Sequence, residues 1–342
     1  MVVRRPDIFL KPSGRPCFCQ KESARSVQTC FDSNLIKMNT ILIIGGSGLV
    51  GRHLTQMLLR AGYKVIWLTR HIQNDIDIVQ YKWDWQRQTI DRTAFEETDT
   101  IINLSGASIN GRRWNTAWKK AIYDSRVRST NFLFECISKQ PNKIKTYISA
   151  SATGIYGVTT TDHIFHETDE PANDFLAKTC QDWESAASQF SSLGIRTVMI
   201  RSGIALSSDS TAFKNIILPV KWGLGAALGT GQQVFPWIYV EDLCAIYMRA
   251  VEYTSMYGAY NAVAPESITN HTLMKSLANH LQKPFWLPNV PAWVIKTLFG
   301  QLADSLLHGS RISADKIQST GFKFEYPQLN KALDAIVPSR HS

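Results

Sequence analysis

The chain has 342 residues, of which 44% are hydrophobic and 19% charged, and its formal net charge at pH 7 is +9. This composition is typical of a folded globular protein, and no run of about 18 apolar residues is present that would span a bilayer. No basic run or RNA-binding motif stands out either, so we expect neither a membrane nor a nucleic acid as a partner.

The six cysteines are distributed without a recognisable framework. Three lie within the first 37 residues, and the other three are scattered singly at Cys136, Cys180 and Cys244. This spacing matches neither a disulfide scaffold nor a zinc site, so the sequence predicts a reducing compartment, the cytoplasm. His163 and His166 have no third ligand nearby in the sequence, so we predict that they lie in a surface loop and that no metal is bound.

The leader, residues 1–37, lacks hydrophobic periodicity and holds seven Lys or Arg against three acidic residues. Two interpretations are open. The stretch is Arg-rich and acid-poor, as a presequence is, or it results from a start codon placed upstream of the true start at Met38. In either case its composition predicts disorder.

A glycine turn follows the first predicted strand. The apolar run at residues 40–44 is typical of a strand buried on both faces of a parallel sheet. The turn leads into a predicted helix at residues 53–61 and a second strand at 64–69, and its glycines satisfy the G-x-G-x-x-G spacing of a dinucleotide site. Small residues let the backbone approach a pyrophosphate, which the helix N-terminus attracts. We therefore predict cofactor contacts from Gly45, Ser47, Gly48, Leu49, Val50 and Gly51.

The end of the second strand indicates which dinucleotide is bound. NAD sites usually carry an acidic residue there to hold the ribose 2′-hydroxyl, but no Asp or Glu occurs between Gly51 and Asp75. The strand ends instead on Thr69 and Arg70, and a guanidinium can grip a 2′-phosphate through charge-assisted bonds. The sequence therefore predicts NADP(H) as the cofactor.

The remaining elements alternate between strand and helix. Strands are predicted at residues 79–83, 100–104, 145–150 and 196–201, and helices at 125–139 and 175–190. This alternation predicts an α/β fold, a Rossmann-type doubly wound parallel sheet. Small residues after the 100–104 strand would let the dinucleotide lie over its end, so Leu104, Ser105 and Gly106 are predicted cofactor contacts. Arg126 either points at the cofactor or is a surface charge.

The C-terminal part is predicted to form a small, mostly helical substrate lobe. A proline-punctuated link at residues 284–291 precedes predicted helices at 292–299 and 313–319. The expected domains are the leader, a cofactor-binding Rossmann domain at 38–282 with substrate-lobe insertions, and a short C-terminal domain at 283–336.

A set of motifs resembles the extended or atypical short-chain dehydrogenases of the NAD-dependent epimerase/dehydratase type. They are the glycine turn, Asn103–Gly106, Ser151 with Tyr156-Gly157, and Trp237–Leu243. Further motifs resemble the "epimerase family protein" subgroup, which carries its own short C-terminal domain; they are Arg112–Asn115, Ser125-Arg126, Asp182–Glu184, Arg201–Gly203, Gly229–Gln233, Tyr260–Pro265, Gly300–Ala303 and Gly321–Pro327. The resemblance covers about residues 38–336. It implies NADP(H) binding by the residues named above, with a further contact near Ala205.

The usual catalytic pair of short-chain dehydrogenases is missing. None of the eleven tyrosines has a lysine four residues later, and Phe175 and Thr179 stand about where the pair is expected. The usual mechanism, in which the tyrosine moves a proton while the nicotinamide moves a hydride, therefore cannot be transferred. The remaining catalytic candidates are Ser151, which would hydrogen-bond a substrate carbonyl or cap a strand, and Tyr156, which is catalytic or structural.

Three further side chains are candidates for binding substrate. Arg201, at the carboxyl end of a predicted strand, would hold an anionic substrate or form a buried ion pair. Gln233 and Tyr239 would line the pocket.

Two hypotheses on function follow from these residues. The first is an NADP(H)-dependent oxidoreductase or epimerase acting on a small polar substrate, sugar-like or carbonyl-containing, because a pocket with converging polar groups is the default site. The second is a non-catalytic NADP(H)-binding sensor or interaction protein, because the Tyr-Lys pair is missing.

Overall fold

The computed structural model describes residues 39–109 and 113–337. The leader, for which disorder was predicted, and Arg112, the first residue of one of the matched motifs, lie outside the described residues. Among the described helices, none is both long and apolar enough to cross a bilayer.

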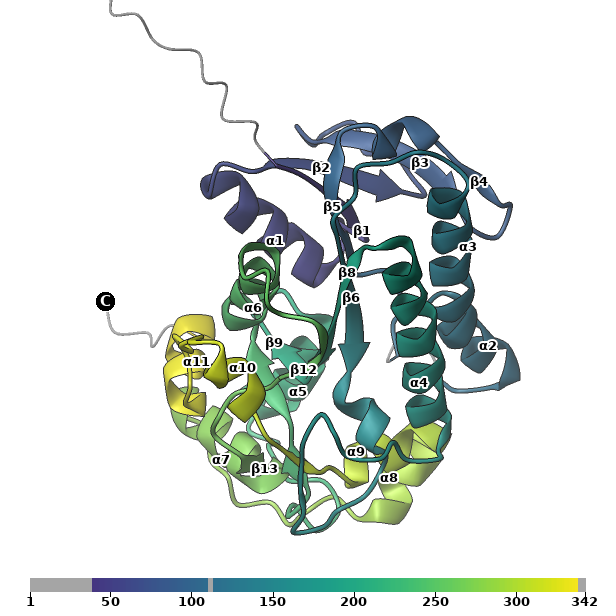
Figure 1. Ribbon diagram of the computed structural model, residues 1–342. Coiled ribbons are helices and arrows are strands. Elements are labelled where there is room, and N and C mark those ends of the chain that lie inside the picture. Colours follow the sequence, from purple (N-terminus) through teal and green to yellow (C-terminus); the bar gives the residue numbers. More distant parts are fainter. Residues whose placement is uncertain (1–38, 110–112, 338–342) are drawn as a thin grey trace, which may run out of the picture. The chain divides into compact units, whose positions relative to one another are not determined.

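The centre of the fold is an eight-stranded sheet with the strand order β12-β8-β6-β5-β1-β2-β3-β4 (Figure 1). All neighbours in it pair in parallel except β3 and β4, which form an antiparallel edge. The strand order reverses on either side of β1, as it does in doubly wound dinucleotide-binding sheets. The strands are β1 (Thr40–Ile44), β2 (Lys64–Thr69), β3 (Val79–Asp84), β4 (Thr89–Ile90), β5 (Thr98–Asn103), β6 (Thr146–Ala152), β8 (Arg196–Ser202) and β12 (Gly258–Ala262).

Helices cover both faces of the sheet, as Figure 1 shows. One face carries α1 (Leu49–Arg60) and α6 (Val240–Glu252), and the other carries α2 (Thr116–Asp124), α3 (Val127–Ser138) and α4 (Phe175–Ser188). The central strand β1 is buried on both sides because its side chains alternate between the two layers. Ile41 and Ile43 pack in the core of α1 and α6, whereas Leu42 and Ile44 pack in the core of α3. This layering confirms the predicted Rossmann-type class.

The predicted elements of the sheet are present with small shifts of their ends. The helix after the glycine turn begins at Leu49 rather than His53, so the last glycine of the turn lies inside it. Two strands of the eight-stranded sheet were not predicted. One is the short edge strand β4, and the other is β12, which pairs in parallel with β8 and extends the sheet by one strand. The sequence of β12, Gly-Ala-Tyr-Asn-Ala, contains few residues that favour strands, and its burial against β8 overrides that preference.

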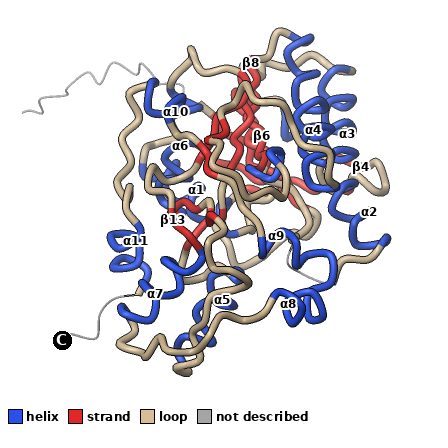
Figure 2. The backbone as a smooth tube through the Cα atoms, turned by 90° about the horizontal axis from the view of Figure 1, so that it is seen from below, coloured by secondary structure: helices blue, strands red, loops and turns tan. Residues whose placement is uncertain are grey.

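Most of the C-terminal lobe lies at the carboxyl ends of β6 and β8, toward the bottom of Figure 1, and Figure 2 shows its helices from that side. Its helices are α5 (Thr211–Lys221), α7 (Asn270–His280), α8 (Ala292–Phe299), α9 (Ala303–Leu307), α10 (Asp315–Ser319) and α11 (Leu329–Ile336). Three two-stranded pairs connect it to the Rossmann part: β7 (Ile164–Phe165) with β14 (Arg311–Ile312), β9 (Ile204–Leu206) with β11 (Trp237–Tyr239), and β10 (Val234–Phe235) with β13 (Ile268–Thr269). α5, α7 and α11 share one apolar core. The lobe is therefore small and mostly helical, as predicted.

A buried carboxylate fastens the last segment of the chain to this framework. Asp242, in α6, is 2% exposed, and its two oxygens accept hydrogen bonds from the backbone N–H groups of Glu325 and Tyr326 at 2.8 and 2.9 Å. Two motifs that the sequence analysis matched separately, Trp237–Leu243 and Gly321–Pro327, thus meet at one contact.

Candidate active site

The glycine turn leaves β1 at a point where larger residues would collide with the backbone. Gly45 has a φ of +83°, and a Cβ there would lie 3.0 Å from the carbonyl oxygen of Leu104. A Cβ on Gly51 would lie 2.4 Å from the carbonyl oxygen of Gly45, because the first turn of α1 rests directly on the glycine turn. The sequence therefore requires glycine at both positions to bring the helix N-terminus against the end of β1.

The N-terminus of α1 offers unpaired donors. Its N-cap is Gly48, which provides no side-chain hydrogen bond, and its first turn contains no acidic residue. The first N–H groups of a helix have no partner within the helix and, together with the helix dipole, attract an anion. The predicted contacts Leu49, Val50 and Gly51 form this turn, and the turn's geometry suits the diphosphate of a dinucleotide.

Replacing Gly51 by alanine should disrupt this arrangement. The new methyl group would need the space held by the Gly45 and Gly46 carbonyl groups, so α1 must move away from the turn. We expect the free energy of unfolding to fall by about 1 to 3 kcal/mol, as in other overpacked sites, and NADPH affinity to fall at least about tenfold. Equilibrium unfolding and NADPH titration of the purified variant measure the two effects.

Gly225→Ala is the matched control, because a Cβ there makes only ordinary contacts of 3.4 Å or more with side chains of Val220 and Phe285. Wild-type NADPH affinity in Gly51→Ala would contradict the assignment of the turn.

Thr69 is the last residue of β2 and Arg70 follows it; β2 pairs with β1 so that Leu68 lies opposite Ile44. They therefore lie at the same edge of the sheet as the glycine turn. The Thr69 hydroxyl donates to the carbonyl of His71 at 3.0 Å. Arg70 is exposed, and no hydrogen bond or ion pair to another described residue occupies its guanidinium. Arg70 is thus available for a phosphate placed beside the turn.

The predicted contacts after β5 lie on the other side of β1. The Leu104 N–H donates to the Ile44 carbonyl at 2.9 Å, and Ser105 is held by two hydrogen bonds to the buried amide oxygen of Asn103. The Arg126 guanidinium donates to the carbonyls of Ala107 and Ile122, both at 3.1 Å, and a Cβ on Gly106 would lie 3.0 Å from it. Arg126 is therefore fixed at this edge rather than lying as a free surface charge.

An ionic cluster that the sequence analysis did not identify borders the glycine turn. Arg52 donates to the Ser47 carbonyl at 2.9 Å and to the carboxylate of Asp209 at 2.8 Å. His53 lies between Asp209 and Glu241, at 3.4 and 2.9 Å. Although burial acts in the opposite direction, hydrogen bonds from Ser207, Arg52 and His53 lower the pKa of Asp209 below its usual range. The cluster ties the turn to the segment that follows β9, the strand that contains the predicted contact Ala205.

Ser151, Tyr156 and Arg201 meet in one buried network around Glu184. Arg201 forms a bidentate ion pair with Glu184 at 2.8 Å for both contacts, and the Ser151 hydroxyl donates to the same carboxylate at 2.6 Å. The Tyr156 hydroxyl accepts from Arg201 at 3.0 Å and donates to the Asn261 amide oxygen at 2.7 Å. These residues are at most 9% exposed. The groups that the sequence offered as catalytic or substrate-binding are thus bonded to one another inside the protein.

The electrostatics of this network keep the tyrosine protonated. Burial raises the pKa of Tyr156 to about 12, although the neighbouring Arg201 acts in the opposite direction. Burial alone would lower the pKa of Arg201, but the Glu184 carboxylate raises it above its usual value. Tyr156 is therefore held in its neutral, protonated form near neutral pH.

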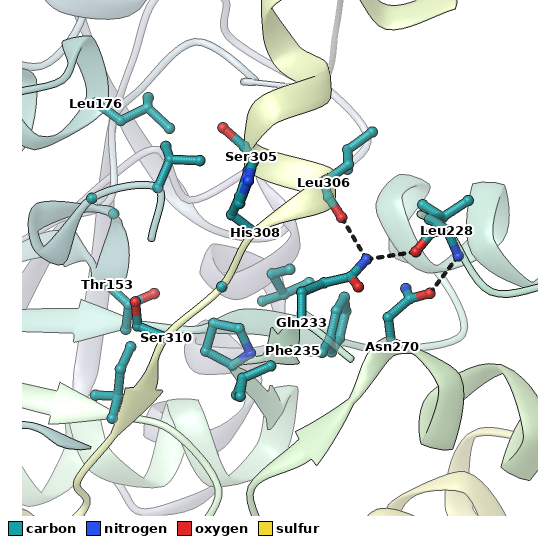
Figure 3. A pocket seen from close by; sticks show the side chains of 18 of the residues that line it. Thr153, Leu176, Leu228, Gln233, Phe235, Asn270, Ser305, Leu306, His308 and Ser310 are labelled. Carbon is teal, nitrogen blue, oxygen red and sulfur yellow. Dashed lines mark hydrogen bonds between the residues drawn. The ribbon is translucent and has the colours of Figure 1, made fainter. Parts of the chain in front are cut away.

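Two adjoining cavities lie at the carboxyl ends of β6 and β8. The proximal cavity, of about 200 Å³, is lined by Thr153, Gly154, Ile204, Gln233, Leu306 and His308, among others (Figure 3). The distal cavity, of about 480 Å³, is lined by Arg113, Ile216, Leu224, Met274, Leu298 and Phe299, among others. Ile216, Leu228 and Leu306 belong to both linings, so the cavities share part of their wall. This is the edge of the sheet at which ligands bind in such folds.

Of the three predicted substrate residues, only Gln233 belongs to this lining. Its amide nitrogen donates to the carbonyls of Leu228 and Leu306 at 3.0 and 3.1 Å, which connects the lobe to the loop before β10 (Figure 3). Tyr239 instead packs edge-on against Tyr326, with ring centroids 4.4 Å apart, and Arg201 pairs with Glu184. Neither Tyr239 nor Arg201 lines either cavity.

Two polar side chains of the proximal cavity were missed by the sequence analysis. Thr153 follows β6 directly, and no hydrogen bond to another described residue occupies its hydroxyl. The Nδ1 atom of His308 donates to the Asp304 carbonyl at 3.0 Å, so its Nε2 atom is left for another partner. Nothing in the local sequence marks either residue, because they are 155 positions apart in the chain. In the part of the chain that the structure describes, no cluster of His, Cys, Asp or Glu is placed to hold a metal.

Comparison with known proteins identifies relatives over almost all of the described chain. Residues 41–262 match the model of the NAD-dependent epimerase/dehydratase family, and residues 290–336 match a domain of unknown function, DUF1731. The epimerase family protein YfhF of Bacillus subtilis is 34% identical over 304 residues, which cover 88% of this chain and 98% of that protein.

The crystal structure of the human epimerase family protein SDR39U1 with NADPH is similar with a TM-score of 0.77 and 28% identity, and the match covers 87% of this chain and 99% of that one. MoeE5 in complex with UDP-glucose and NAD has a TM-score of 0.71 at 17% identity, over 87% of this chain and 97% of that one, a likeness of fold alone.

Proposed function

The chain belongs to the NAD-dependent epimerase/dehydratase family, and from this premise we propose that it is an NADP(H)-dependent oxidoreductase acting on a carbonyl–alcohol pair. The observation that carries the proposal is the proximal cavity. It lies at the carboxyl ends of β6 and β8, and two uncommitted polar groups of its wall, on Thr153 and His308, suit a reacting oxygen.

The proposal of NADP(H) as the cofactor rests on the residues around β1. The glycine turn leaves a space beside the N-terminus of α1 that side chains at the glycine positions would fill. Arg70, directly after β2, has a guanidinium with no hydrogen bond or ion pair to another described residue. The similar human protein was crystallised with NADPH. We propose that Gly45, Ser47, Gly48, Leu49, Val50 and Gly51 hold the diphosphate, that Thr69 and Arg70 hold the 2′-phosphate, and that Leu104–Gly106, Arg126 and Ala205 border the rest of the cofactor.

Bound NADP(H) would supply or accept the hydride. On the protein side, the Thr153 hydroxyl can donate a hydrogen bond to a substrate carbonyl oxygen in the proximal cavity, which stabilises the charge that develops there. His308 holds a proton on Nδ1, which leaves its Nε2 atom able to accept a hydrogen bond from a substrate hydroxyl. In this proposal Ser151, Tyr156 and Arg201 are positioning residues, because their bonds to Glu184 and Asn261 fix the carboxyl ends of β6 and β8.

The alternative is a protein that binds NADP(H) without turnover. The observation that favours it is the position of Tyr156, whose hydroxyl is buried and bonded to both Arg201 and Asn261, so it is not open to a substrate as the usual catalytic tyrosine is. The two functions differ in whether a hydride ever leaves the nucleotide.

The test measures whether the hydride at C4 of NADPH is transferred to a substrate. Wild-type protein is incubated with NADPH deuterated at C4 and a panel of aldehydes, ketones and nucleotide sugars, and deuterium in the products is measured by mass spectrometry. We expect transfer to at least one carbonyl compound. Thr153→Val should then lower kcat about a hundredfold, the effect of losing one donor to a developing oxyanion, while the Kd for NADPH stays within about twofold. Saturable NADPH binding with no transfer to any compound would establish the alternative.

We further propose that the protein acts in a reducing compartment such as the cytoplasm. The described cysteines, Cys136, Cys180 and Cys244, are all free and buried.

A further inference from the structure

The wall of the distal cavity is made mostly of hydrocarbon. Side chains from four parts of the lobe converge on it: Ile216 and Pro219 from α5, Leu224 from the following loop, Met274 from α7, and Leu298 and Phe299 from α8. The cavity volume of about 480 Å³ lies in the range of about 300 to 1,000 Å³ that is usual for small-molecule sites. The space is therefore suited in size to a ligand and in chemistry to an apolar one.

The described lining of the distal cavity offers few polar side chains to a sugar, because besides Arg113 it contains only Asn215 and Asn270. The Asn270 amide oxygen already accepts from the Leu228 N–H at 2.8 Å, and the Gln233 amide nitrogen, in the proximal lining, donates to two backbone carbonyls (Figure 3). The Ser310 hydroxyl donates to the Thr159 carbonyl at 2.8 Å. A hydroxyl-rich ligand would lose its bonds to water here without replacing them, which is costly.

One positive charge borders this apolar wall. Arg113 is exposed and has no ion pair or hydrogen bond to another described residue. Its side chain passes over Gly300, which has a φ of +59° and where a Cβ would lie 3.0 Å from the Arg113 Nε atom. No Asp or Glu belongs to the described lining of either cavity. The glycine thus leaves room for a guanidinium next to Leu298 and Phe299, with no protein carboxylate to neutralise it.

From this combination we propose that the distal cavity binds an amphipathic monoanion, a medium-chain aliphatic carboxylate whose hydrocarbon chain fills the cavity and whose carboxylate pairs with Arg113. Together with the proposed oxidoreductase function, on which this step rests, the substrate is an apolar carboxylate with its reacting oxygen in the proximal cavity. The single cation matches a single carboxylate, whereas the diphosphate of a nucleotide sugar carries more charge than Arg113 can balance.

The binding test compares ligands that differ only in their head group. Decanoate, decan-1-ol and UDP-glucose are titrated calorimetrically, at ligand concentrations below micelle formation, into the full chain saturated with NADPH. We expect decanoate to bind with a negative heat-capacity change, the marker of apolar burial. Decan-1-ol should bind about tenfold more weakly, since it lacks the charge-assisted bond, and UDP-glucose should not bind.

Two pairs of variants assign the effect to the cavity. Arg113→Met should weaken decanoate about tenfold and leave decan-1-ol within about twofold. Lys296→Met, which removes one charge from an exposed position of α8, should change neither ligand. Ile216→Trp places a larger side chain in the wall that the two cavities share and should abolish binding of decanoate and decan-1-ol. Leu218→Trp is its control and should abolish binding of neither ligand. Leu218 lies in the same helix, is 48% exposed and lines neither cavity.

NADPH titration of every variant keeps this proposal separate from the proposed function. If the wild-type protein did not bind NADPH, the cofactor assignment would be overturned, but the proposed ligand of the distal cavity would not. Three outcomes would each overturn the proposal of an amphipathic carboxylate. The first is decanoate binding that is unchanged in Ile216→Trp, and the second is an equal loss of decanoate affinity in Arg113→Met and Lys296→Met. The third is tighter binding of UDP-glucose than of decanoate.

Discussion

Replacing Glu184 by glutamine is expected to lower the free energy of unfolding by about 3 kcal/mol or more. The Glu184 side chain is 11% exposed, and its carboxylate is the counter-charge of the Arg201 side chain, which is 8% exposed. Removing one partner of a buried ion pair leaves the other charge in a poorly solvated place, at a cost of about 3 to 5 kcal/mol. Urea unfolding at neutral pH of the wild type and the variant measures the difference.

Two control variants distinguish the lost ion pair from other causes. Glu135→Gln removes a carboxylate from an exposed pair with Lys139, at 3.5 Å, and should cost less than about 0.5 kcal/mol. The double variant Glu184→Leu with Arg201→Met removes both buried charges and should recover part of the stability lost by Glu184→Gln. A double variant less stable than Glu184→Gln, or a loss from Glu184→Gln no larger than that of the surface control, would show that Arg201 does not depend on this carboxylate.

The second large effect concerns the choice of nucleotide. Arg70→Ala should weaken NADPH about 10- to 100-fold, because a hydrogen bond to a charged group contributes about 1.5 to 3 kcal/mol, while NADH affinity should change less than about threefold. Arg70 carries no competing ion pair within the described residues, so its loss should leave the fold unchanged. Parallel fluorescence titrations with NADPH and NADH measure both constants.

Arg87→Ala, at a position where the side chain is 85% exposed, controls for the change in net charge. An equal loss of affinity for both nucleotides in Arg70→Ala would reject the 2′-phosphate assignment, and no loss for either would remove Arg70 from the site altogether.

The framework of the cofactor site could be predicted from local sequence because local sequence creates it. A continuous apolar run buries β1 on both faces, and the glycines after it are the only residues that fit where α1 rests on the turn. The absence of an acidic residue after β2 points to Arg70 for a similar reason, since the parallel pairing of β1 and β2 brings the two strand ends to the same edge.

The candidate catalytic residues could not be predicted in the same way. Ser151, Tyr156 and Arg201 have suitable chemistry, but a polar side chain at a strand end can face a cavity or a buried partner, and sequence does not distinguish the two. Here Glu184, from a helix on one face of the sheet, meets Ser151 and Arg201 and satisfies them. β12 was missed because its own residues do not favour a strand and only its pairing with β8 makes it one.

The sequence by itself determined the class of fold, the glycine turn and the candidate for a 2′-phosphate, since each depends on residues close together in the chain or on the regular geometry of parallel strands. The tertiary structure decided which polar groups are free. It placed Thr153 and His308 around one cavity, lined the adjoining cavity with hydrocarbon beside Arg113, and enclosed Tyr156. Such choices arise when segments more than a hundred residues apart pack together, because the partner of a buried polar group is set by its neighbours in space.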